Sequence, residues 1–166
     1  DEVVAFTHAI DSEIIGITND VLIGGTDKDL IRSDEQNGGN LVADAQLAAA
    51  QARAASFDVD VPQIAIANAG GIRSDIAAGT ISVGDTFDVS PFGNFVSVVE
   101  NVTTADLKLV LENALSCTID NDPGVAVAPL RVGDGTGRFP QIAGMTVTYD
   151  ITRSPLVLDA ETETIT

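Results

Sequence analysis

Apolar residues recur at two different spacings along this chain, which predicts a mixture of helices and strands. Between Leu107 and Leu115 they stand three or four positions apart, the spacing that places them on one face of a helix. Between Met145 and Tyr149 they alternate with polar residues, as in a half-exposed strand. Both kinds of element are therefore expected in one chain.

The same criteria place the remaining elements. An alanine-rich segment follows the sequence Asn-Gly-Gly-Asn at residues 37–40, where an asparagine can cap the start of a helix. Helices are expected over residues 3–15, 41–56, 82–89 and from Thr103 or Thr104 to 115, and strands over 17–22, 61–67, 95–99 and 145–149. Residues 26–36, 116–124 and 133–137 are expected to be loops. The loose alternation predicts the α+β class, a mixed α/β domain.

Size and charge narrow the function classes. The chain has 166 residues, 45% hydrophobic and 20% charged, so it can bury a core and is unlike a disordered acidic tail. Its 25 acidic and 8 basic residues give a formal net charge of −17. So acidic a surface repels phosphate backbones and anionic membranes, which excludes nucleic-acid binding through a broad basic face. No apolar run approaches the roughly 18 residues of a membrane-spanning helix, so no membrane insertion is expected.

The residues needed for common catalytic sets are scarce. His8 is the single histidine, which leaves no partner for a zinc site, a two-metal site or a Ser-His-Asp triad. Cys117 is the single cysteine and has no histidine near it in sequence, so neither an intrachain disulfide nor a thiol nucleophile is expected. The glycine-rich residues 133–138 lack the Lys-Ser/Thr of a P-loop and read as a surface loop. We predict no catalytic residue and no metal ligand in this chain.

The loop from Asn68 to Arg73 is the strongest candidate for a binding site. Gly70 and Gly71 allow close backbone approach to a ligand, successive N–H groups there could form an anion nest, and Arg73 adds a planar set of donors. A tight turn with Arg73 in a surface ion pair explains the same residues equally well. Phe92 lies on a predicted turn, where a place in the core is the commoner role and stacking on a base is the alternative.

These segments resemble the C-terminal domain of the 5′-nucleotidase family. The resemblance is carried by NAGGIRSDI at residues 68–76, GTI at 79–81, SPFGN at 90–94, EQNGGNLVADA at 35–45 and GRFPQ at 137–141, in the family's order. It implies that Asn68 and Arg73 hold the ribose or phosphate, with Arg32 as a second arginine. It further implies that Phe92 forms one face of an aromatic clamp on the base, with Asn94 at the base edge.

The resemblance also implies a division of labour between domains. In the family, a metallophosphoesterase domain carries two divalent metals and the catalytic residues, and the C-terminal domain binds the nucleoside. Residues 1–16 would be a lead-in helix or interdomain linker, and residues 17–166 the nucleoside-binding domain, inactive by itself and extracellular or periplasmic. A 2′,3′-cyclic-nucleotide phosphodiesterase, a UDP-sugar hydrolase or a non-catalytic binding module with the same fold remain alternatives.

The chain departs from the family pattern after Asp150. The family continues to an aromatic residue and a glycine-rich loop that supply the second ring of the clamp, and neither is present here. The domain is therefore expected to be incomplete at its C-terminus. We expect the sheet edge left open to be covered by the missing segment or by a second copy of the chain.

Overall fold

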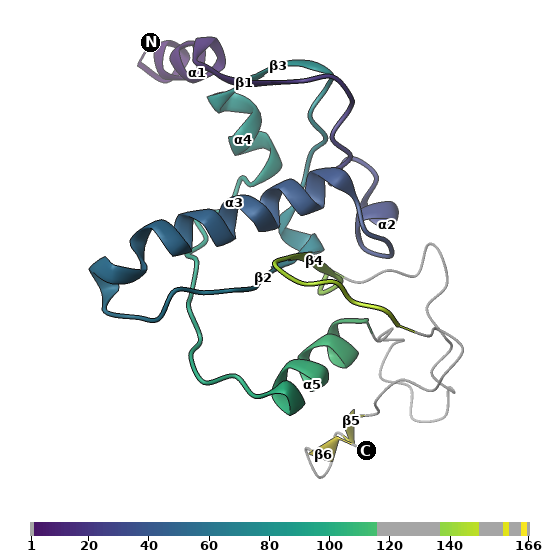
Figure 1. Ribbon diagram of the computed structural model, residues 1–166. Helices are drawn as coiled ribbons and strands as arrows, with labels where there is room; N and C mark the ends of the chain where they lie inside the picture. Colours follow the sequence, from purple (N-terminus) through teal and green to yellow (C-terminus); the bar gives the residue numbers. More distant parts are fainter. Residues whose placement is uncertain (1, 116–136, 150–157, 160–163, 166) are drawn as a thin grey trace.

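A computed structural model describes residues 2–115, 137–149, 158–159 and 164–165 (Figure 1). Helices and short antiparallel strand pairs make up the described chain, so the predicted α+β class is confirmed. In chain order the elements are α1 (Glu2–Ser12), β1 (Ile14–Thr18), α2 (Lys28–Ile31), α3 (Asn37–Arg53), β2 (Ala65–Asn68), β3 (Gly79–Ser82), α4 (Val83–Val89), α5 (Thr104–Leu115), β4 (Pro140–Ala143), β5 (Leu158–Asp159) and β6 (Thr164–Ile165).

The long helix α3 lies across the antiparallel pair β2–β4 (Figure 1). The register of the pair runs from Ala65 opposite Ala143 to Asn68 opposite Pro140. Small side chains fill the contact between helix and strands, where Ala43, Ala67 and Ala143 form a buried cluster. Because alanine keeps the helix close to the strands, the alanine-rich segment of the sequence becomes the helix nearest the β2–β4 pair.

Helix α3 begins at Asn37, four residues before the predicted start. Its first turn holds two buried glycines, and an added Cβ at Gly38 or Gly39 would overlap Ile23 or Gln141. The predicted asparagine cap is wrong, because Gln36 is the N-cap residue and makes no side-chain capping bond. The glycines therefore mark a close approach inside the helix rather than a loop before it.

A second buried cluster packs against Val42 of α3. The cluster anchors the two loops that carry Arg32 and Arg73. Ile31, next to Arg32, and Ile72, next to Arg73, are both buried in it. The members of this cluster are Ile31, Ala69, Ile72, Ile76, Val89 and Phe139. The amide of Ala69 also donates to the carbonyl of Phe139, which ties the loop after β2 to the approach to β4.

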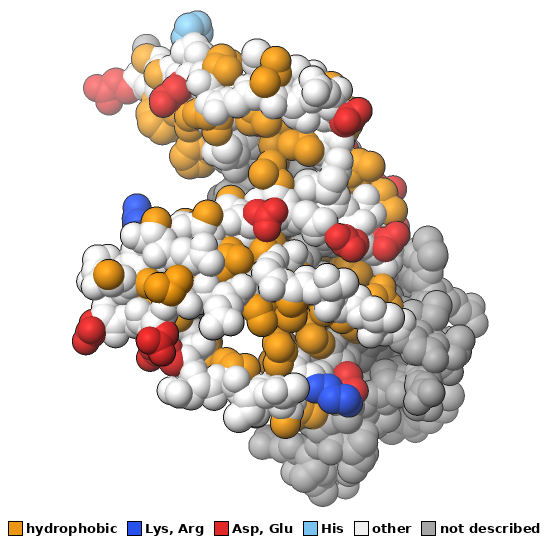
Figure 2. Space-filling model, in the orientation of Figure 1, with side chains coloured by type: hydrophobic (Ala, Val, Ile, Leu, Met, Phe, Trp, Pro, Cys, Tyr) orange, Lys and Arg blue, Asp and Glu red, His pale blue; other side chains and the backbone are white. Residues whose placement is uncertain are grey.

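The N-terminal elements form a smaller layer of their own. β1 pairs antiparallel with β3, and α4 follows β3 directly through a capping box in which Ser82 and Asp85 bond each other's backbone amides. Helix α1 packs on α4, with Asp11 against Gly84. A hollow with apolar side chains on both sides separates this layer from α3 (Figure 2). The proposed division after residue 16 falls inside β1 and stays a prediction.

Two predicted strands are absent from their predicted places. Residues 95–99 form no strand with any described residue, and Phe95 is 95% exposed. Residues 145–149 also lack a partner among the described residues, and the strand of this region is β4, five residues earlier. Both predictions are therefore wrong as placed, because strand pairing depends on a partner that the local sequence does not specify.

Other element boundaries differ by a few residues. The predicted strand over residues 61–67 is β2, which starts only at Ala65, after Pro62, a residue without an amide donor. The predicted strand over 17–22 is β1, which starts at Ile14. The charged segment 26–36 contains the short helix α2, capped by the side chain of Asp27. The predicted loop over residues 116–124, and Cys117 within it, lies outside the described residues, as does most of residues 133–138.

Candidate functional site

The loop after β2 presents polar side chains on a rigid base. β2 ends at Asn68, and a 3₁₀ turn over Ala69–Gly71 follows. Ala69 and Ile72 are buried in the core, whereas the side chains of Asn68 and Arg73 are exposed. The buried side chains of Ala69 and Ile72 hold the loop backbone in place. The polar side chains of Asn68 and Arg73 are therefore presented at the surface from a fixed backbone.

Four backbone amides of this loop already donate to protein carbonyls. The amides of Gly70 and Arg73 donate to the carbonyls of Gly137 and Val89, at 2.7 and 2.9 Å. The amides of Ala69 and Ile72 also donate to protein carbonyls. The expectation that successive N–H groups form an anion nest is therefore wrong for these amides. A ligand at this loop would be held mainly by side chains.

Gly70 and Gly71 differ in what they approach. A Cβ on Gly70 would lie 2.9 Å from the Cα of Gly137, so this glycine permits two loops to cross. A Cβ on Gly71 would have ordinary contacts with the side chain of Asn68, 3.6 Å away. Gly70 thus has a structural reason to be glycine, and the ligand-binding role of both residues stays a prediction.

Phe92 and Arg73 lie against each other. The guanidinium carbon of Arg73 is 5.1 Å from the centre of the Phe92 ring, within the range of a cation–π contact. The ring is 48% exposed, so Phe92 is not a core residue. Among the described residues Arg73 is engaged with this aromatic ring and not with a carboxylate, which favours the binding-site interpretation of the loop over the surface ion pair.

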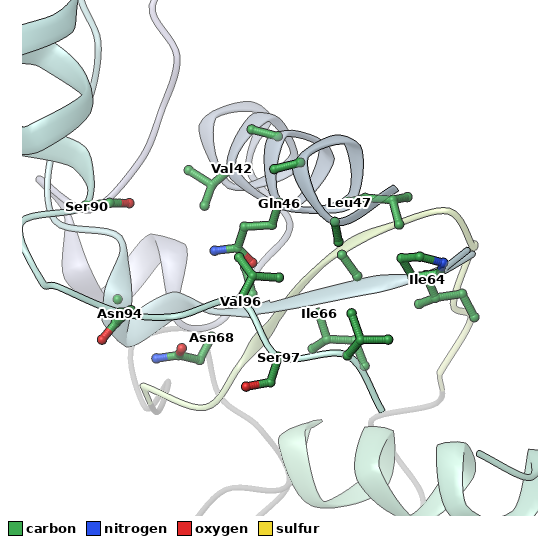
Figure 3. Close-up of a pocket in the computed structure, with 18 of the residues that line it drawn as sticks. Val42, Gln46, Leu47, Ile64, Ile66, Asn68, Ser90, Asn94, Val96 and Ser97 are labelled. Atoms are coloured by element: carbon green, nitrogen blue, oxygen red, sulfur yellow. The ribbon is translucent and has the colours of Figure 1, made fainter. Parts of the chain in front are cut away.

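A large groove of about 1560 Å³ opens beside these residues. Figure 3 shows α3 on one side with Val42, Gln46 and Leu47 facing β2, and the extended segment of Asn94 and Val96 passing alongside β2. The groove is bounded further on by residues 94–102 and by α5. Of the predicted site residues, those that line it are Asn68, Gly71, Phe92 and Asn94.

Arg32, Gly70 and Arg73 do not line this groove, and Arg73 meets it only through the Phe92 ring. Arg32 is half-buried at the end of α2, and its Nε is buried without a hydrogen-bond partner among the described residues. The structure therefore brings four of the seven predicted site residues to the groove, holds Arg73 beside it against Phe92, and leaves Arg32 on a neighbouring loop.

Close packing fixes the neighbouring loop relative to Arg73. A Cβ on Gly25 would overlap the carbonyl oxygen of Ile72 and lie 2.5 Å from the Cα of Arg73. A carboxylate oxygen of Asp75 accepts a hydrogen bond from the amide of Gly24 at 2.7 Å. The segment that leads to α2 is thereby locked to the loop that carries Arg73, although the two are about fifty residues apart in sequence.

Two residues of this framework escaped sequence analysis. Asp75 had the signal of a carboxylate close to the glycine-rich loop, which is typical of a side chain that caps backbone amides. Gln141 is fully buried, with 0% exposure, and its amide group bonds the backbone around Arg32. Its only sequence signal is a polar residue inside a short apolar segment, which does not tell which loop it contacts.

Acidic groups near the start of α3 affect one titrating side chain. Burial raises the pKa of the Tyr149 hydroxyl above its ordinary value, and the charges of Asp34 and Glu35 raise it further. The neutral phenol is therefore the form present at this side of the Arg32 loop at physiological pH.

The described residues contain no group of three or more His, Cys, Asp or Glu side chains placed to hold a metal ion. No helix among them is long and apolar enough to cross a membrane. His8 lies exposed on α1.

Comparison with known proteins places the chain in a family. The family described as "5′-nucleotidase, C-terminal domain" matches residues 14–165. The trifunctional nucleotide phosphoesterase protein YfkN of Bacillus subtilis is 35% identical over 146 residues, covering 88% of this chain and 8% of that protein. The snake venom 5′-nucleotidase of Crotalus adamanteus is 30% identical over 152 residues, covering 89% of this chain and 23% of that protein.

A solved structure gives the same result. The crystal structure of the 5′-nucleotidase precursor from Thermus thermophilus superimposes with a TM-score of 0.60 at 28% identity, covering 86% of this chain and 24% of that one. The chain belongs to the 5′-nucleotidase family and corresponds to its C-terminal domain. It spans less than a quarter of the length of each of these relatives.

Proposed function

We propose that this chain is the nucleotide-binding domain of a metal-dependent 5′-nucleotidase. The observation that carries the proposal is the meeting of Asn68, Phe92 and Asn94 at one groove, with Arg73 against the Phe92 ring. The free face of an exposed aromatic ring can stack on a base, and Asn94 offers a donor and an acceptor for the base edge. Asn68 and the arginines Arg73 and Arg32 would hold the ribose and the phosphate.

Phosphate hydrolysis would take place on another domain. We infer an upstream metallophosphoesterase domain that holds two divalent metals, which activate water for attack on the phosphomonoester. Closure between the two domains would bring the bound phosphate to those metals. The names of the relatives, a venom 5′-nucleotidase and a nucleotidase precursor, support an extracellular or periplasmic location.

The identity of the phosphate ester is a separate question. The Bacillus subtilis relative is a trifunctional nucleotide phosphoesterase, which favours keeping a cyclic-nucleotide phosphodiesterase as a second candidate. A UDP-sugar hydrolase or a non-catalytic module would use the same base-binding groove. All four share nucleoside recognition by this chain, so the binding experiment below tests what they have in common.

Residues 1–166 should bind AMP and leave it intact. We expect calorimetric titration to show AMP binding more tightly than adenosine, because only AMP offers a phosphate to the arginines. We expect no phosphate release when Mn²⁺ or Zn²⁺ is added, since one histidine in the sequence cannot build a two-metal site.

Ribose 5-phosphate serves as the control ligand, because it carries the phosphate without the base. If it binds as tightly as AMP, the base does not contribute and the clamp at Phe92 is wrong. Release of phosphate from AMP by the purified chain, in step with the chain's own concentration and not with a contaminant, would place catalysis in this domain instead.

The groove also leaves backbone edges without partners. Among the described residues, β2 pairs with β4 on one side, and the extended residues 95–99 run past its other side unpaired (Figure 3). Exposed Phe95, Val96 and Val99 make this edge apolar. We propose that a further strand covers it, from another segment of the polypeptide or from a second copy, because long apolar edges are rarely left in solvent.

Hydrogen exchange would detect this cover. We expect the amides of residues 95–99 to exchange slowly in the full-length protein. In residues 1–166 alone, we expect protection that rises with protein concentration as copies associate, followed in parallel by analytical ultracentrifugation. Rapid exchange in both samples, with a monomer at all concentrations, would contradict the proposal.

A further inference from the structure

Gln141 is a buried polar residue whose hydrogen-bonding groups all point at one loop. The side chain is fully buried in β4. Its Nε2 donates to the carbonyl of Ile31 at 3.0 Å and to the carbonyl of Asp34 at 2.9 Å. Its Oε1 accepts from the amide of Gln36 at 3.1 Å. One side chain therefore satisfies backbone groups at both ends of residues 31–36.

The surrounding structure is shaped to admit this side chain. Gly39 has no Cβ where the Gln141 amide lies, and any side chain there would overlap it. Ile31, whose carbonyl takes one of the bonds, is itself fully buried in the core. A buried amide that is completely hydrogen-bonded is specific in its geometry, because any displacement of the loop leaves a donor or acceptor unpaired.

Arg32 is the charged residue on this loop. It follows Ile31 directly, so the bond to the Ile31 carbonyl fixes the peptide group from which the Arg32 side chain starts. The buried Nε of Arg32 has no hydrogen-bond partner among the described residues, which leaves a donor in place for an acceptor that the described chain does not supply. An arginine held by its backbone in this way loses less freedom when it meets an anion.

We propose that Gln141 is a positioning residue, which holds the Arg32 loop so that Arg32 can engage the phosphate of the ligand. The inference rests on the proposed nucleotide-binding function. It assigns to Gln141 no contact with the ligand, and it explains why the side chain's bonds converge on the loop around one arginine. A purely structural Gln141 would lower stability without changing which part of the ligand is recognised.

The test compares AMP with adenosine, because their affinity ratio isolates the contribution of the phosphate. We expect Gln141→Met to lower this ratio by about tenfold or more, the effect of losing one charge-assisted hydrogen bond. Arg32→Gln should lower it by a similar factor. The double variant should be no worse than Arg32→Gln alone, since Gln141 acts through Arg32.

Gln51→Met is the matched control. Gln51 also donates to a backbone carbonyl, that of Pro62 at 3.0 Å, but on the exposed side of α3. We expect this variant to keep the AMP-to-adenosine ratio of the wild type. All titrations would be made on the full-length protein with its metals removed by a chelator, so that AMP is bound and not hydrolysed, at a temperature where urea denaturation shows each variant to be folded.

Gln141→Glu provides a second variant in case the methionine variant does not fold. An ionised carboxylate would face the carbonyls of Ile31 and Asp34 without a proton to donate, whereas the protonated acid restores one donor. The affinity ratio, taken relative to the wild type at each pH, should therefore recover as the pH falls. The amide of Gln36 should exchange faster with solvent in the Gln141→Met variant, because methionine offers no oxygen to accept its hydrogen bond.

The outcomes separate the two proposals. A wild-type ratio in the Gln141 variants, together with faster exchange at Gln36, would show a structural residue and overturn the inference alone. An additive double variant would also overturn it. If the wild type does not distinguish AMP from adenosine and Arg32→Gln changes nothing, the phosphate role of Arg32 is wrong, and the inference fails with that part of the proposed function.

Discussion

Gly25→Ala should destabilise the domain by more than about 3 kcal/mol, enough to unfold a marginally stable protein. The added Cβ would overlap the carbonyl oxygen of Ile72 and lie 2.5 Å from the Cα of Arg73, so it meets backbone that is itself anchored in the core. Because no flexible side chain can move aside, the two loops must separate. Urea denaturation followed by circular dichroism would measure the loss as a lower midpoint or as the absence of a folded baseline.

Gly93→Ala is the matched control. An added Cβ there has no neighbour within 4 Å, and the residue is not among those with positive φ. We expect its stability to stay within about 0.5 kcal/mol of the wild type, as for ordinary surface substitutions. Equal midpoints for the two alanine variants would show that the loops are not packed as the structure has them.

The contact between Gly25 and Ile72 shows why the binding loop could be predicted from the sequence while the segment that packs against it could not. The pattern from β2 to Arg73 is local: an apolar run, two glycines and an arginine in sequence order. The partner of Gly25 is Ile72, whose position follows from the tertiary fold and not from the residues around Gly25. Asn68, Arg73 and Phe92 could therefore be named from the sequence, while the structure was needed to show that four N–H groups of the loop already donate to carbonyls.

Strand positions show the same limit. The β-branched residues of 95–99 and the alternation over 145–149 predicted strands, but neither segment pairs with another described residue. Pairing requires complementary edges from elsewhere in the chain, and β4 forms where residues 140–143 meet β2. The helices were better predicted, because their hydrogen bonds are local: α5 covers Thr104–Leu115, the last described residues of this segment, and includes the apolar stripe from Leu107 to Leu115.

The role of Gln141, unlike the start of a helix, could not be predicted from neighbouring residues. Its bonds span more than one hundred residues of sequence, from β4 back to the loop before α3. A glutamine between proline and isoleucine suggests an edge strand as readily as a buried one. Only the fold shows that Gln141 is buried and that its side chain bonds the backbone of residues 31–36 around Arg32.

Phe92→Ala should weaken recognition of the nucleotide by roughly tenfold or more, because stacking on an aromatic side chain is worth about 1–3 kcal/mol per base. In the full-length protein the effect should appear mostly as a higher KM with little change in kcat, since the ring binds the base and lies away from the phosphate. The half-exposed ring has Arg73 near it at 5.1 Å, so removing it also leaves that guanidinium without its aromatic partner. Steady-state kinetics with AMP and with ribose 5-phosphate would separate the two consequences.

Ribose 5-phosphate tests the arginine alone, and AMP tests the arginine and the ring together. If Phe92 acts as a base platform, the Phe92→Ala variant keeps its KM for ribose 5-phosphate while its KM for AMP rises, and Phe92→Leu behaves in the same way because an aliphatic side chain cannot stack. Phe57→Ala is the control, since Phe57 is 72% exposed after the end of α3 and does not line the groove. An equal rise in KM for both substrates would mean that the ring serves to hold Arg73 on the phosphate, and the clamp on the base would then have to be sought elsewhere in the groove.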